Sequence, residues 1–392
     1  MPHYRVGVVG YGMAGGVASY LLARDGHSVS LFERAPEVRA VGAGIILQPS
    51  GQQVLRHLGI LDQVLARSAP LDELHAVHTD GRTLIRNRYA DLDPALRGYG
   101  THRGVLFEAV KGLVETEPVD VHLSTDVVRR EVSGREVWLV AADGRRFGPF
   151  DFVVCGDGSR SVLRTALGKR WWQHAYRQGA IWAIAPSRAV QGKLLQVVNG
   201  NRQLCGVLPL GDGLTTLYWG ASVREYDAIR RRGLDALKRE VVSFCPETAE
   251  VLDFIWDMDQ LLFTTYRAVW MARRFDRHGI FLGDASHAMS PHLGQGLNIA
   301  MIDAWLLAGC VREAASPLEA FRLWHRRQEG YLRYYAAVTF ALSPFFQSDV
   351  SLLGWGRDVV LPWLPTIPWV RRQMVMTMAG LKGGFLKGWR EV

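Results

Sequence analysis

The segment GIFLGDASHAMSPHLGQGLNIAMIDA, from Gly279 to Ala304, contains several residues that can do chemistry. A short apolar run ends at Asp284, and a glycine-rich turn follows before an apolar pattern of helical spacing. Backbone N–H groups in such a turn, at the start of a helix, attract anionic or electron-rich oxygen atoms. Pro291 and His292 stand inside this turn, and we take both as candidate catalytic residues.

A second glycine-rich turn lies near the N-terminus, in YRVGVVGYGMAGG. Gly10, Gly12 and Gly15 follow an apolar strand and open a helix, and Glu33 ends a second strand. In a dinucleotide-binding turn the first glycine permits the bend, the second lets a pyrophosphate approach, and the third lets helix and strand pack closely. The acid after the second strand accepts hydrogen bonds from a ribose. This unit therefore predicts a dinucleotide site.

Two further segments carry candidate residues. Asp157 stands between two glycines after the apolar strand FDFVVC, where it either contacts a ligand or caps the next predicted helix. Gly44, in VGAGIILQ, indicates by itself only a loop and a strand. Gln48 follows that segment and could project towards a bound ring, so it is the third catalytic candidate.

The elements that must position these turns follow two patterns. Strand–helix–strand patterns predict a Rossmann-like domain made of residues 1–70, 101–168 and 276–330. Residues 71–100 and 169–275 are rich in strand formers and in turns such as NGN and GDG, which predicts a second domain with an antiparallel sheet. The expected fold class is α/β, with an α+β second domain that binds the substrate.

Composition and charge limit the class of protein. The 392 residues are 48% hydrophobic and 21% charged, which is an ordinary balance for two packed globular domains. The net charge of +8 favours acidic ligands, but no basic and aromatic module accompanies it, so we expect no nucleic acid. The four isolated cysteines predict no metal and a reduced, cytoplasmic location. The sequence contains no uninterrupted run of 18 apolar residues, so we expect no membrane span.

Three motifs in this order resemble the group A FAD-dependent monooxygenases, the aromatic hydroxylases similar to para-hydroxybenzoate hydroxylase and salicylate hydroxylase. The motifs are the N-terminal βαβ fingerprint, CGDGSRSVLR and GDASHAMSPHLGQGLN. The resemblance covers residues 4–330 and implies bound FAD, with NADH or NADPH as a transient reductant. No second dinucleotide fingerprint occurs in the sequence, which suits a reductant that binds only transiently in a groove.

By this resemblance, the first motif and several later positions hold the adenosine half of FAD. The implied contacts are Gly10, Gly12, Ala14 and Gly15 at the pyrophosphate turn, Glu33 and Arg34 at the ribose, Arg103 at the phosphate and ribityl region, and Val127 at the adenine through its backbone. Gly44 is implied as a further cofactor contact.

The third motif is implied to hold the flavin ring. Asp284 would contact the ribityl chain or a phosphate, and Pro291 would lie near the reactive edge. The residues implied to line the ring are Leu293, Gly294, Gln295, Gly296, Leu297 and Asn298. Reduction of a flavin places negative charge at N1 and the C2 carbonyl, which N–H groups at a helix start stabilise. Asp157 belongs to a segment that the family uses for FAD and nicotinamide nucleotide contacts.

The implied reaction has two stages. NAD(P)H reduces FAD, and oxygen then adds at flavin C4a to give a hydroperoxide that hydroxylates an aromatic or similarly electron-rich small molecule. The alternative is a FAD-dependent dehydrogenase or reductase without oxygen insertion, and a lower one is a non-catalytic FAD-binding protein. A halogenase is not expected, because IWAIAP at residues 181–186 lacks the Trp-x-Trp-x-Ile-Pro pattern.

Substrate contacts are expected on the sheet of the second domain. The candidates are Trp182, Arg202, Cys205, Tyr218 and Trp219. A slip of one residue in strand register exchanges the residues that face the ligand, so the set depends on register. A phenol, a quinolone, a polyketide and an indole-derived compound all fit, and a monomer and a homodimer both stay open.

The C-terminal residues 331–392 predict a helical region beyond a minimal family member. They carry Trp355, Trp363, Trp369 and Trp389 among scattered basic residues and the segment LPWLPTIP. A segment that lies on a membrane surface has a similar composition. We favour a helical tail that covers the active-site mouth or the domain seam, because the prolines interrupt any long amphipathic helix. Such a tail could also serve as a dimer contact.

Overall fold

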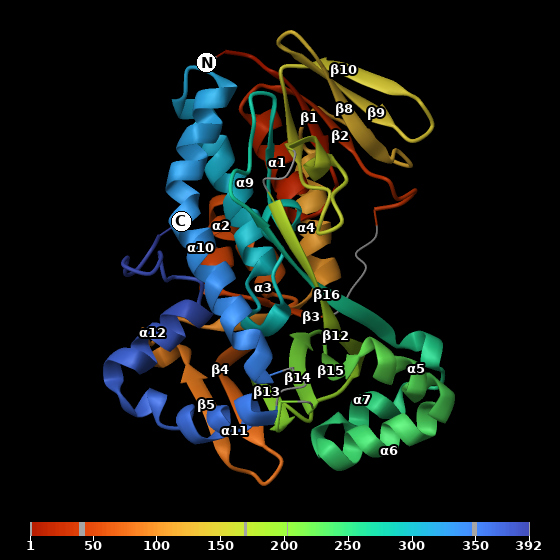
Figure 1. The fold of residues 1–392 in the computed structure, drawn as a ribbon, viewed down its shortest axis with the longest axis vertical. Coiled ribbons are helices and arrows are strands. Elements are labelled where there is room, and N and C mark those ends of the chain that lie inside the picture. Colours follow the sequence, from red (N-terminus) through yellow and green to blue (C-terminus); the bar gives the residue numbers. More distant parts are fainter. Residues whose placement is uncertain (1, 39–43, 168–170, 202, 347–350, 392) are drawn as a thin grey trace.

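The computed structural model describes residues 2–38, 44–167, 171–201, 203–346 and 351–391. A parallel sheet with its helices forms one half of the molecule, and a larger sheet flanked by helices forms the other (Figure 1). This arrangement confirms the expected α/β class with a Rossmann-like domain. The C-terminal helices α11 and α12 lie beside the larger sheet, far from the N-terminus (Figure 1).

The parallel sheet places the three glycine-rich turns at one edge. Its strand order is β17 (Gly279–Phe281), β11 (Phe152–Cys155), β1 (Arg5–Val9), β2 (Ser28–Phe32) and β7 (Val119–His122), all parallel. The turns after β1, β11 and β17 therefore meet, because the carboxyl ends of parallel strands share an edge. Helices α1 (Met13–Arg24), α4 (Arg103–Glu115) and α9 (Gly296–Glu313) share one apolar core.

A small antiparallel sheet shares a second apolar core with the parallel sheet. It consists of β8 (Val127–Ser133), β9 (Glu136–Ala141) and β10 (Arg146–Phe150). The side chains of Val127, Leu139 and Phe150 are buried with Phe32 and Val153 of the parallel sheet. The parallel strands are thus apolar on both sides, as is usual for strands that are buried on both faces.

The larger sheet combines segments that are far apart in the sequence. Its order is β16 (Leu262–Met271), β12 (Trp171–Pro186), β15 (Leu214–Ser222), β14 (Gln203–Gly211), β13 (Gly192–Asn199), β4 (Ser68–His78), β6 (Gly98–His102) and β3 (Gly44–Leu47), with β5 (Thr83–Arg88) beside β4. The predicted antiparallel sheet is in fact mixed, because β4 pairs with β13 in parallel. These two strands come from separate parts of the chain, so no hairpin sets their direction.

Helices complete both halves of the molecule. The helices beside the larger sheet are α5 (Val223–Arg232), α6 (Leu234–Phe244), α7 (Ala249–Asp253), α11 (Ser351–Val360) and α12 (Pro368–Met378). Besides α1, α4 and α9, the remaining helices are α2 (Pro49–His57), α3 (Leu61–Leu65), α8 (Asp284–His287) and α10 (Pro317–Phe346). The structure differs from the predicted domain limits at two places. The segment 44–47 pairs with β6 of the larger sheet, and the limit at residue 330 falls inside α10.

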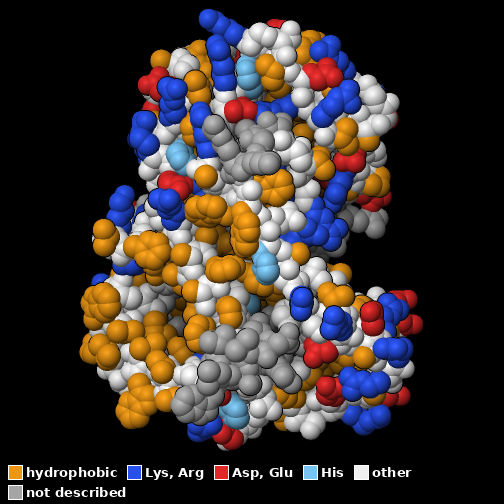
Figure 2. Space-filling model, viewed as in Figure 1, with side chains coloured by type: hydrophobic (Ala, Val, Ile, Leu, Met, Phe, Trp, Pro, Cys, Tyr) orange, Lys and Arg blue, Asp and Glu red, His pale blue; other side chains and the backbone are white. Residues whose placement is uncertain are grey.

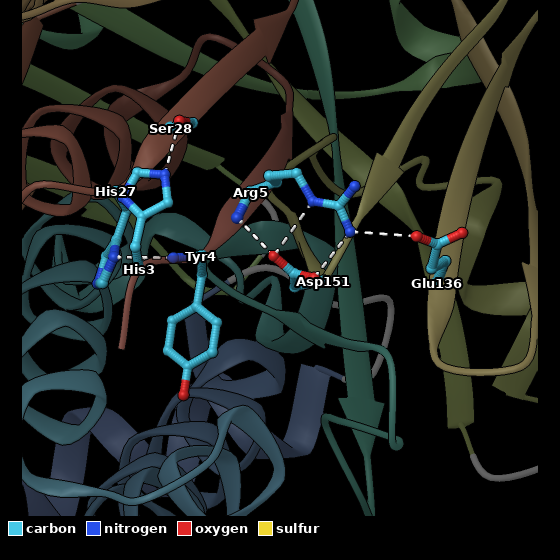
Figure 3. Close-up of polar contacts among 7 residues, drawn as sticks. All are labelled: His3, Tyr4, Arg5, His27, Ser28, Glu136 and Asp151. Carbon is cyan, nitrogen blue, oxygen red and sulfur yellow. Dashed lines mark hydrogen bonds and ion pairs between the residues drawn. The ribbon is translucent and has the colours of Figure 1, made fainter. Parts of the chain in front are cut away.

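The start of β1 is tied to three other segments. Figure 3 shows the Arg5 guanidinium between Asp151 and Glu136, at 3.0 and 3.2 Å from their carboxylate oxygens. Asp151 also accepts the backbone N–H of Arg5 at 2.7 Å. On the other side, the backbone N–H of Tyr4 lies 3.4 Å from Nδ1 of His27 (Figure 3). These contacts hold β1 beside β2 and the β10–β11 turn.

We expect D151A to destabilise the protein by about 1–2 kcal/mol and R5L by less than about 1 kcal/mol. Only D151A leaves a backbone N–H without its acceptor, and the Arg5 side chain is half-exposed. Burial raises the pKa of Asp151, but the Arg5 hydrogen bonds outweigh it and hold the pKa below its usual range. The D151A effect should therefore shrink as pH falls below about 4. Urea unfolding at pH 7 and pH 3 measures this, and equal effects of both variants would contradict it.

Candidate active site

One large cavity joins the edge of the parallel sheet to the larger sheet. Its volume is about 640 Å³. At one end the lining residues come from the three turns and from the start of α4, and they include Gly12, Gly156, Asp284 and Arg103. At the other end they come from one face of the larger sheet and from the C-terminal helices. The turn of Pro291–Leu293 and the residues after it lie at the junction.

The turn after β1 has the shape that a pyrophosphate needs. Gly10 has φ of +98°, and a Cβ there would lie 2.4 Å from the Gly156 carbonyl oxygen. A Cβ at Gly15 would lie 1.9 Å from the carbonyl oxygen of Gly10. At Gly12 a Cβ would meet no protein atom within 4 Å, and no side chain caps the N-terminus of α1 that Gly12 precedes. Uncapped N–H groups beside open space fit an anionic phosphate.

The acid at the end of β2 is held in place by backbone hydrogen bonds. Glu33 accepts the N–H groups of Tyr11 at 2.8 Å and Ala35 at 3.0 Å. Its carboxylate thus lies beside the first turn, where a ribose would need an acceptor. Arg34 is exposed next to it. The side chain of Val127 is buried in the core beneath β8, so only its backbone is available for the predicted adenine contact.

The Asp157 turn is tied to the turn after β17 by a buried arginine. Arg164 donates to the carbonyl oxygens of Ser159 at 2.5 Å and Ala285 at 2.9 Å. Gly156 and Gly158 line the cavity, whereas Asp157 itself does not. Burial raises the pKa of the Asp157 carboxyl, and a hydrogen bond to Ser161 opposes that shift. The predicted helix after this turn is a short 3₁₀ segment, Leu163–Leu167.

The turn after β17 presents an acid and an uncapped helix start to the cavity. Gly283 has φ of +55°, which aims the exposed Asp284 into the cavity. Gly294 has φ of +60°, and Gln295, which precedes α9, makes no capping hydrogen bond with the helix. Gly296 and Leu297 line the cavity at this helix start. An anionic ring edge would find N–H donors there.

Asn298 and Gln295, which are both expected to line the ring, lie in different surroundings. Asn298 is 0% exposed, and its amide accepts the N–H of Gln48 and donates to the carbonyl oxygens of Ile46 and Gly294, each at 3.0 Å. It therefore fastens β3 to the turn and does not line the cavity. Gln295 lines the cavity and donates to the Met378 carbonyl oxygen at 2.6 Å, which joins the turn to α12.

A buried network supports the same turn from behind. Asp303 of α9 is completely buried and accepts the Gly283 N–H at 2.8 Å, with His287 Nε2 at 2.5 Å from the same oxygen. Its other carboxylate oxygen accepts Gln328 Nε2 at 2.7 Å, and Gln328 in turn accepts from Arg390 at 2.8 Å. This chain of contacts connects the cavity wall to the C-terminal segment.

The catalytic candidates line the cavity in different environments. Gln48 is buried, and its side-chain oxygen accepts the Tyr89 hydroxyl at 2.7 Å. Pro291 is exposed to the cavity. His292 Nδ1 lies 2.9 Å from the Ser290 hydroxyl, while its Nε2 is buried without a partner among the described residues. Burial lowers the pKa of His292 to about 4, so its imidazole is neutral at pH 7.

Because His292 is buried in its neutral form, we expect the folded protein to lose stability in mild acid. An unfolded histidine takes up its proton near pH 6.5, but the folded one does so only near pH 4, so stability falls as pH is lowered between these values. When the pH falls from 7.5 to 5, we expect the free energy of unfolding of H292Q to decrease by about 1–2 kcal/mol less than that of the natural chain. Urea unfolding over this range measures the difference. The control is S343A, because the Ser343 hydroxyl lies 2.7 Å from that of Ser290 and its removal keeps the imidazole. S343A should behave like the natural chain, and parallel curves for H292Q and the natural chain would contradict the prediction.

Strand register decides which candidates on the larger sheet reach the cavity. Trp182 pairs with Tyr218, and both line the cavity with their rings 5.1 Å apart. Cys205 pairs with Trp219, and both side chains are buried on the opposite face, where Trp219 packs on Phe244 of α6. The expectation that Cys205 and Trp219 face a ligand is therefore wrong. Arg202 lies outside the described residues.

Several cavity residues were absent from the predicted set. They are Asn87, Gln196, Tyr266, Tyr334 and Gln373. Gln196 donates to the Tyr218 hydroxyl, and it belongs to the same row as Trp182 because β13, β14, β15 and β12 pair in register. The alternation within β13 would have indicated Gln196 once its partner strands were known. Tyr334 and Gln373 come from helices that only the fold brings to the site.

The C-terminal region covers the cavity. Leu361, Leu364, Trp369 and Met374 from α12 and the segment before it line the cavity wall. Hydrophobic side chains gather over the α11 and α12 region at the lower left of Figure 2. In the part of the chain that the structure describes, no helix is both long and apolar enough to span a membrane. These contacts support the interpretation of the tail as a cover for the site.

Comparison with known proteins agrees with this geometry. The model of a family described as FAD binding domain matches residues 3–318. The chain belongs to this FAD-binding family. A probable 2-heptyl-3-hydroxy-4(1H)-quinolone synthase from Rhodococcus erythropolis is 30% identical over 81% of this chain and 82% of its own length. A 6-hydroxynicotinate 3-monooxygenase from Pseudomonas fluorescens is 28% identical over 80% of this chain and 83% of its own length.

Solved structures share the fold of this FAD-binding protein. A 2-methyl-3-hydroxypyridine-5-carboxylic acid oxygenase matches with a TM-score of 0.78 and 23% identity, over 88% of this chain and 93% of its own. An HpxO variant from Klebsiella pneumoniae complexed with FAD matches with a TM-score of 0.82 and 19% identity, over 96% of this chain and 99% of its own. Together with the family match, the named relatives identify the chain as a FAD-dependent monooxygenase of the group A type.

Proposed function

We propose that this monooxygenase uses NADH or NADPH and O₂ to hydroxylate a small aromatic molecule that binds beside the flavin ring. The observation that carries the proposal is one continuous cavity that joins a dinucleotide turn at Gly12 to an aromatic chamber at Trp182 and Tyr218. The relatives named as a quinolone synthase and a nicotinate monooxygenase support an aromatic substrate.

The residues at the dinucleotide end fit FAD. Gly12 and the start of α1 would receive the pyrophosphate, Glu33 the ribose, and Arg103 and Asp284 the remaining polar groups of the linker. When bound, FAD supplies the two-electron chemistry and the activation of oxygen. The N–H groups at the start of α9 would stabilise negative charge on the ring.

Residues in the other part of the cavity would hold the substrate and exclude water. Trp182 donates to the Thr264 hydroxyl at 2.9 Å, so its indole is fixed beside the Tyr218 ring and can contact an aromatic substrate. Neutral His292 offers Nε2 as a hydrogen-bond partner for a substrate polar atom and can exchange a proton with it. The α12 residues over the cavity would keep water from the reacting atoms.

The first experiment is rapid mixing of the chemically reduced, FAD-loaded protein with oxygenated buffer. We expect a transient absorbance spectrum, distinct from those of reduced and oxidised flavin, before full reoxidation. We also expect an aromatic ligand to accelerate NADH or NADPH oxidation and to gain one oxygen atom from ¹⁸O₂. Direct reoxidation without the transient, in the presence of every ligand tested, would instead favour a dehydrogenase or reductase. No ligand-dependent turnover with FAD bound would favour a binding protein.

A further inference from the structure

In the part of the chain that the structure describes, the charged residues of the cavity wall lie at its dinucleotide end. Among the described residues that line it, Arg103 and Asp284 are the charged ones, and both lie with the FAD-binding turns. The part formed by the larger sheet and the C-terminal helices is lined by aliphatic, aromatic and neutral polar side chains. An ionised substrate group in this chamber would therefore meet no described side chain of opposite charge.

Three arginines of the described residues are fully buried, and each is engaged outside the cavity. Arg164 donates to backbone carbonyl groups of the Asp157 and Asp284 turns. Arg274 pairs with Glu329. Arg357 donates to the Phe345 carbonyl oxygen at 3.0 Å and contacts Asp358. None of these three lines the cavity, so they do not provide a partner for an anionic substrate.

Among the described residues that line the cavity, the side-chain atoms that are buried without a hydrogen-bond partner are uncharged. One is Gln295 Oε1, in the turn before α9, and three others belong to residues of the chamber. Asn87 is buried and its Oδ1 has no hydrogen-bond partner among the described residues. The same holds for His292 Nε2 and for Gln373 Oε1. All three residues line the cavity. A buried polar group without a partner is costly, so these positions call for hydroxyl, carbonyl or ring N–H groups on a ligand.

An apolar arm extends from the chamber to the surface. The sheet contributes Leu74, Leu194, Leu204 and Leu208, and the C-terminal helices contribute Leu361, Leu364, Val370 and Met374. Trp369 lines the cavity and is 70% exposed, so the arm reaches the protein surface at α12. The exposed Trp363 and Ile367 lie in the same segment. The side chains named here are all apolar, and Gln373 of α12 is a neutral polar residue beside them.

We propose that the substrate is an uncharged aromatic compound that carries a hydrocarbon chain. The ring lies near Trp182 and Tyr218, its polar atoms pair with Asn87 or His292, and the chain follows the apolar arm towards Trp369. This inference rests on the proposed function, and it excludes a carboxylate at the chamber end. Burial of an unpaired carboxylate is costly, whereas each buried methylene is favourable.

The test measures binding to the oxidised, FAD-loaded protein without NADH or NADPH. Dissociation constants come from the change in flavin absorbance for phenol, 4-ethylphenol, 4-butylphenol and 4-hexylphenol, and for 3-(4-hydroxyphenyl)propanoate, which matches 4-butylphenol in length. We expect affinity to rise about threefold per methylene. We expect the propanoate to bind at least about thirtyfold more weakly than 4-butylphenol. Equal or tighter binding of the propanoate, or no binding by any alkylphenol, overturns the proposal.

Variants on α12 test where the hydrocarbon chain of the ligand lies. W369A should reduce the gain per methylene, and M374K should weaken 4-hexylphenol at least about tenfold while it strengthens the propanoate. R372Q is the matched control, because Arg372 is exposed on the same helix and does not line the cavity. If affinity rises by the same factor per methylene in W369A, M374K and the natural protein, the proposed arm is wrong. Propanoate binding that R202Q abolishes would overturn the uncharged substrate class.

Ligand binding and ligand-dependent turnover separate the substrate class from the hydroxylase reaction. If the alkylphenols bind as expected but no ligand accelerates NADH or NADPH oxidation, the ligand class stands and the hydroxylase proposal fails. If only the carboxylate accelerates turnover, the hydroxylase proposal stands and the uncharged substrate class is wrong.

Discussion

Replacing Gly12 with valine is expected to weaken FAD binding at least about a hundredfold while the apoprotein keeps its fold. The backbone at Gly12 has φ of −87° and ψ of −171°, which any residue adopts, and an added Cβ would meet no protein atom within 4 Å. A side chain there would occupy the space in which the pyrophosphate approaches the start of α1. Loss of about two charge-assisted hydrogen bonds accounts for this magnitude.

Titration of apoprotein with FAD, followed by flavin fluorescence, measures the effect. G112A is the matched control, because Gly112 is exposed within α4 and a Cβ there also meets open space. It should leave FAD affinity unchanged and stabilise the helix by up to about 1 kcal/mol. FAD affinity in G12V within threefold of that of the natural chain would show that the pyrophosphate does not approach Gly12.

The second large effect is expected at Asp303. D303A should destabilise the protein by about 3–5 kcal/mol, because it removes a fully buried carboxylate that accepts from Gly283, His287 and Gln328. The Gly283 N–H and the His287 ring would then be buried without this acceptor. Urea unfolding of the FAD-loaded protein at pH 7.5, followed by tryptophan fluorescence, measures the loss.

A variant of an exposed carboxylate on the same helix shows how much of the D303A destabilisation comes from burial of the carboxylate. Glu313 pairs with Arg327 at 2.8 Å, but its side chain is half-exposed at the end of α9. E313A should therefore cost less than about 1 kcal/mol. A D303A effect as small as that of E313A would mean that the buried network does not support the turn after β17.

The elements around the glycine-rich turns were largely predictable from local patterns. The apolar strands before Gly10 and Gly283 and the helices after them follow from residues that are adjacent in the sequence. The side chain of Asn298 ties β3 to the predicted turn, and the sequence does not reveal this contact because its partners Ile46 and Gln48 are about 250 residues away. Hydrogen bonds between such distant segments leave no periodic signal in a single sequence.

The sheet of the second domain shows the same limit. Alternation along β14 and β15 separates two sets of side chains but does not say which set faces the cavity. Helices α5, α6 and α7 cover one face, which buries Cys205 and Trp219, so Tyr218 is left for the other face. The parallel pairing of β4 with β13 also depends on segments that are not neighbours in the sequence.

The chemistry of the turns and the α/β class of the fold follow from the sequence alone, because glycine conformation, helix starts and apolar periodicity are properties of short segments. The tertiary structure alone decided the contents of the substrate chamber. Its walls combine β5, β13, β15 and α12, and their side chains meet through strand register and helix packing. Tertiary contacts also keep the buried arginines of the described residues out of the cavity, since these arginines find partners in distant parts of the chain.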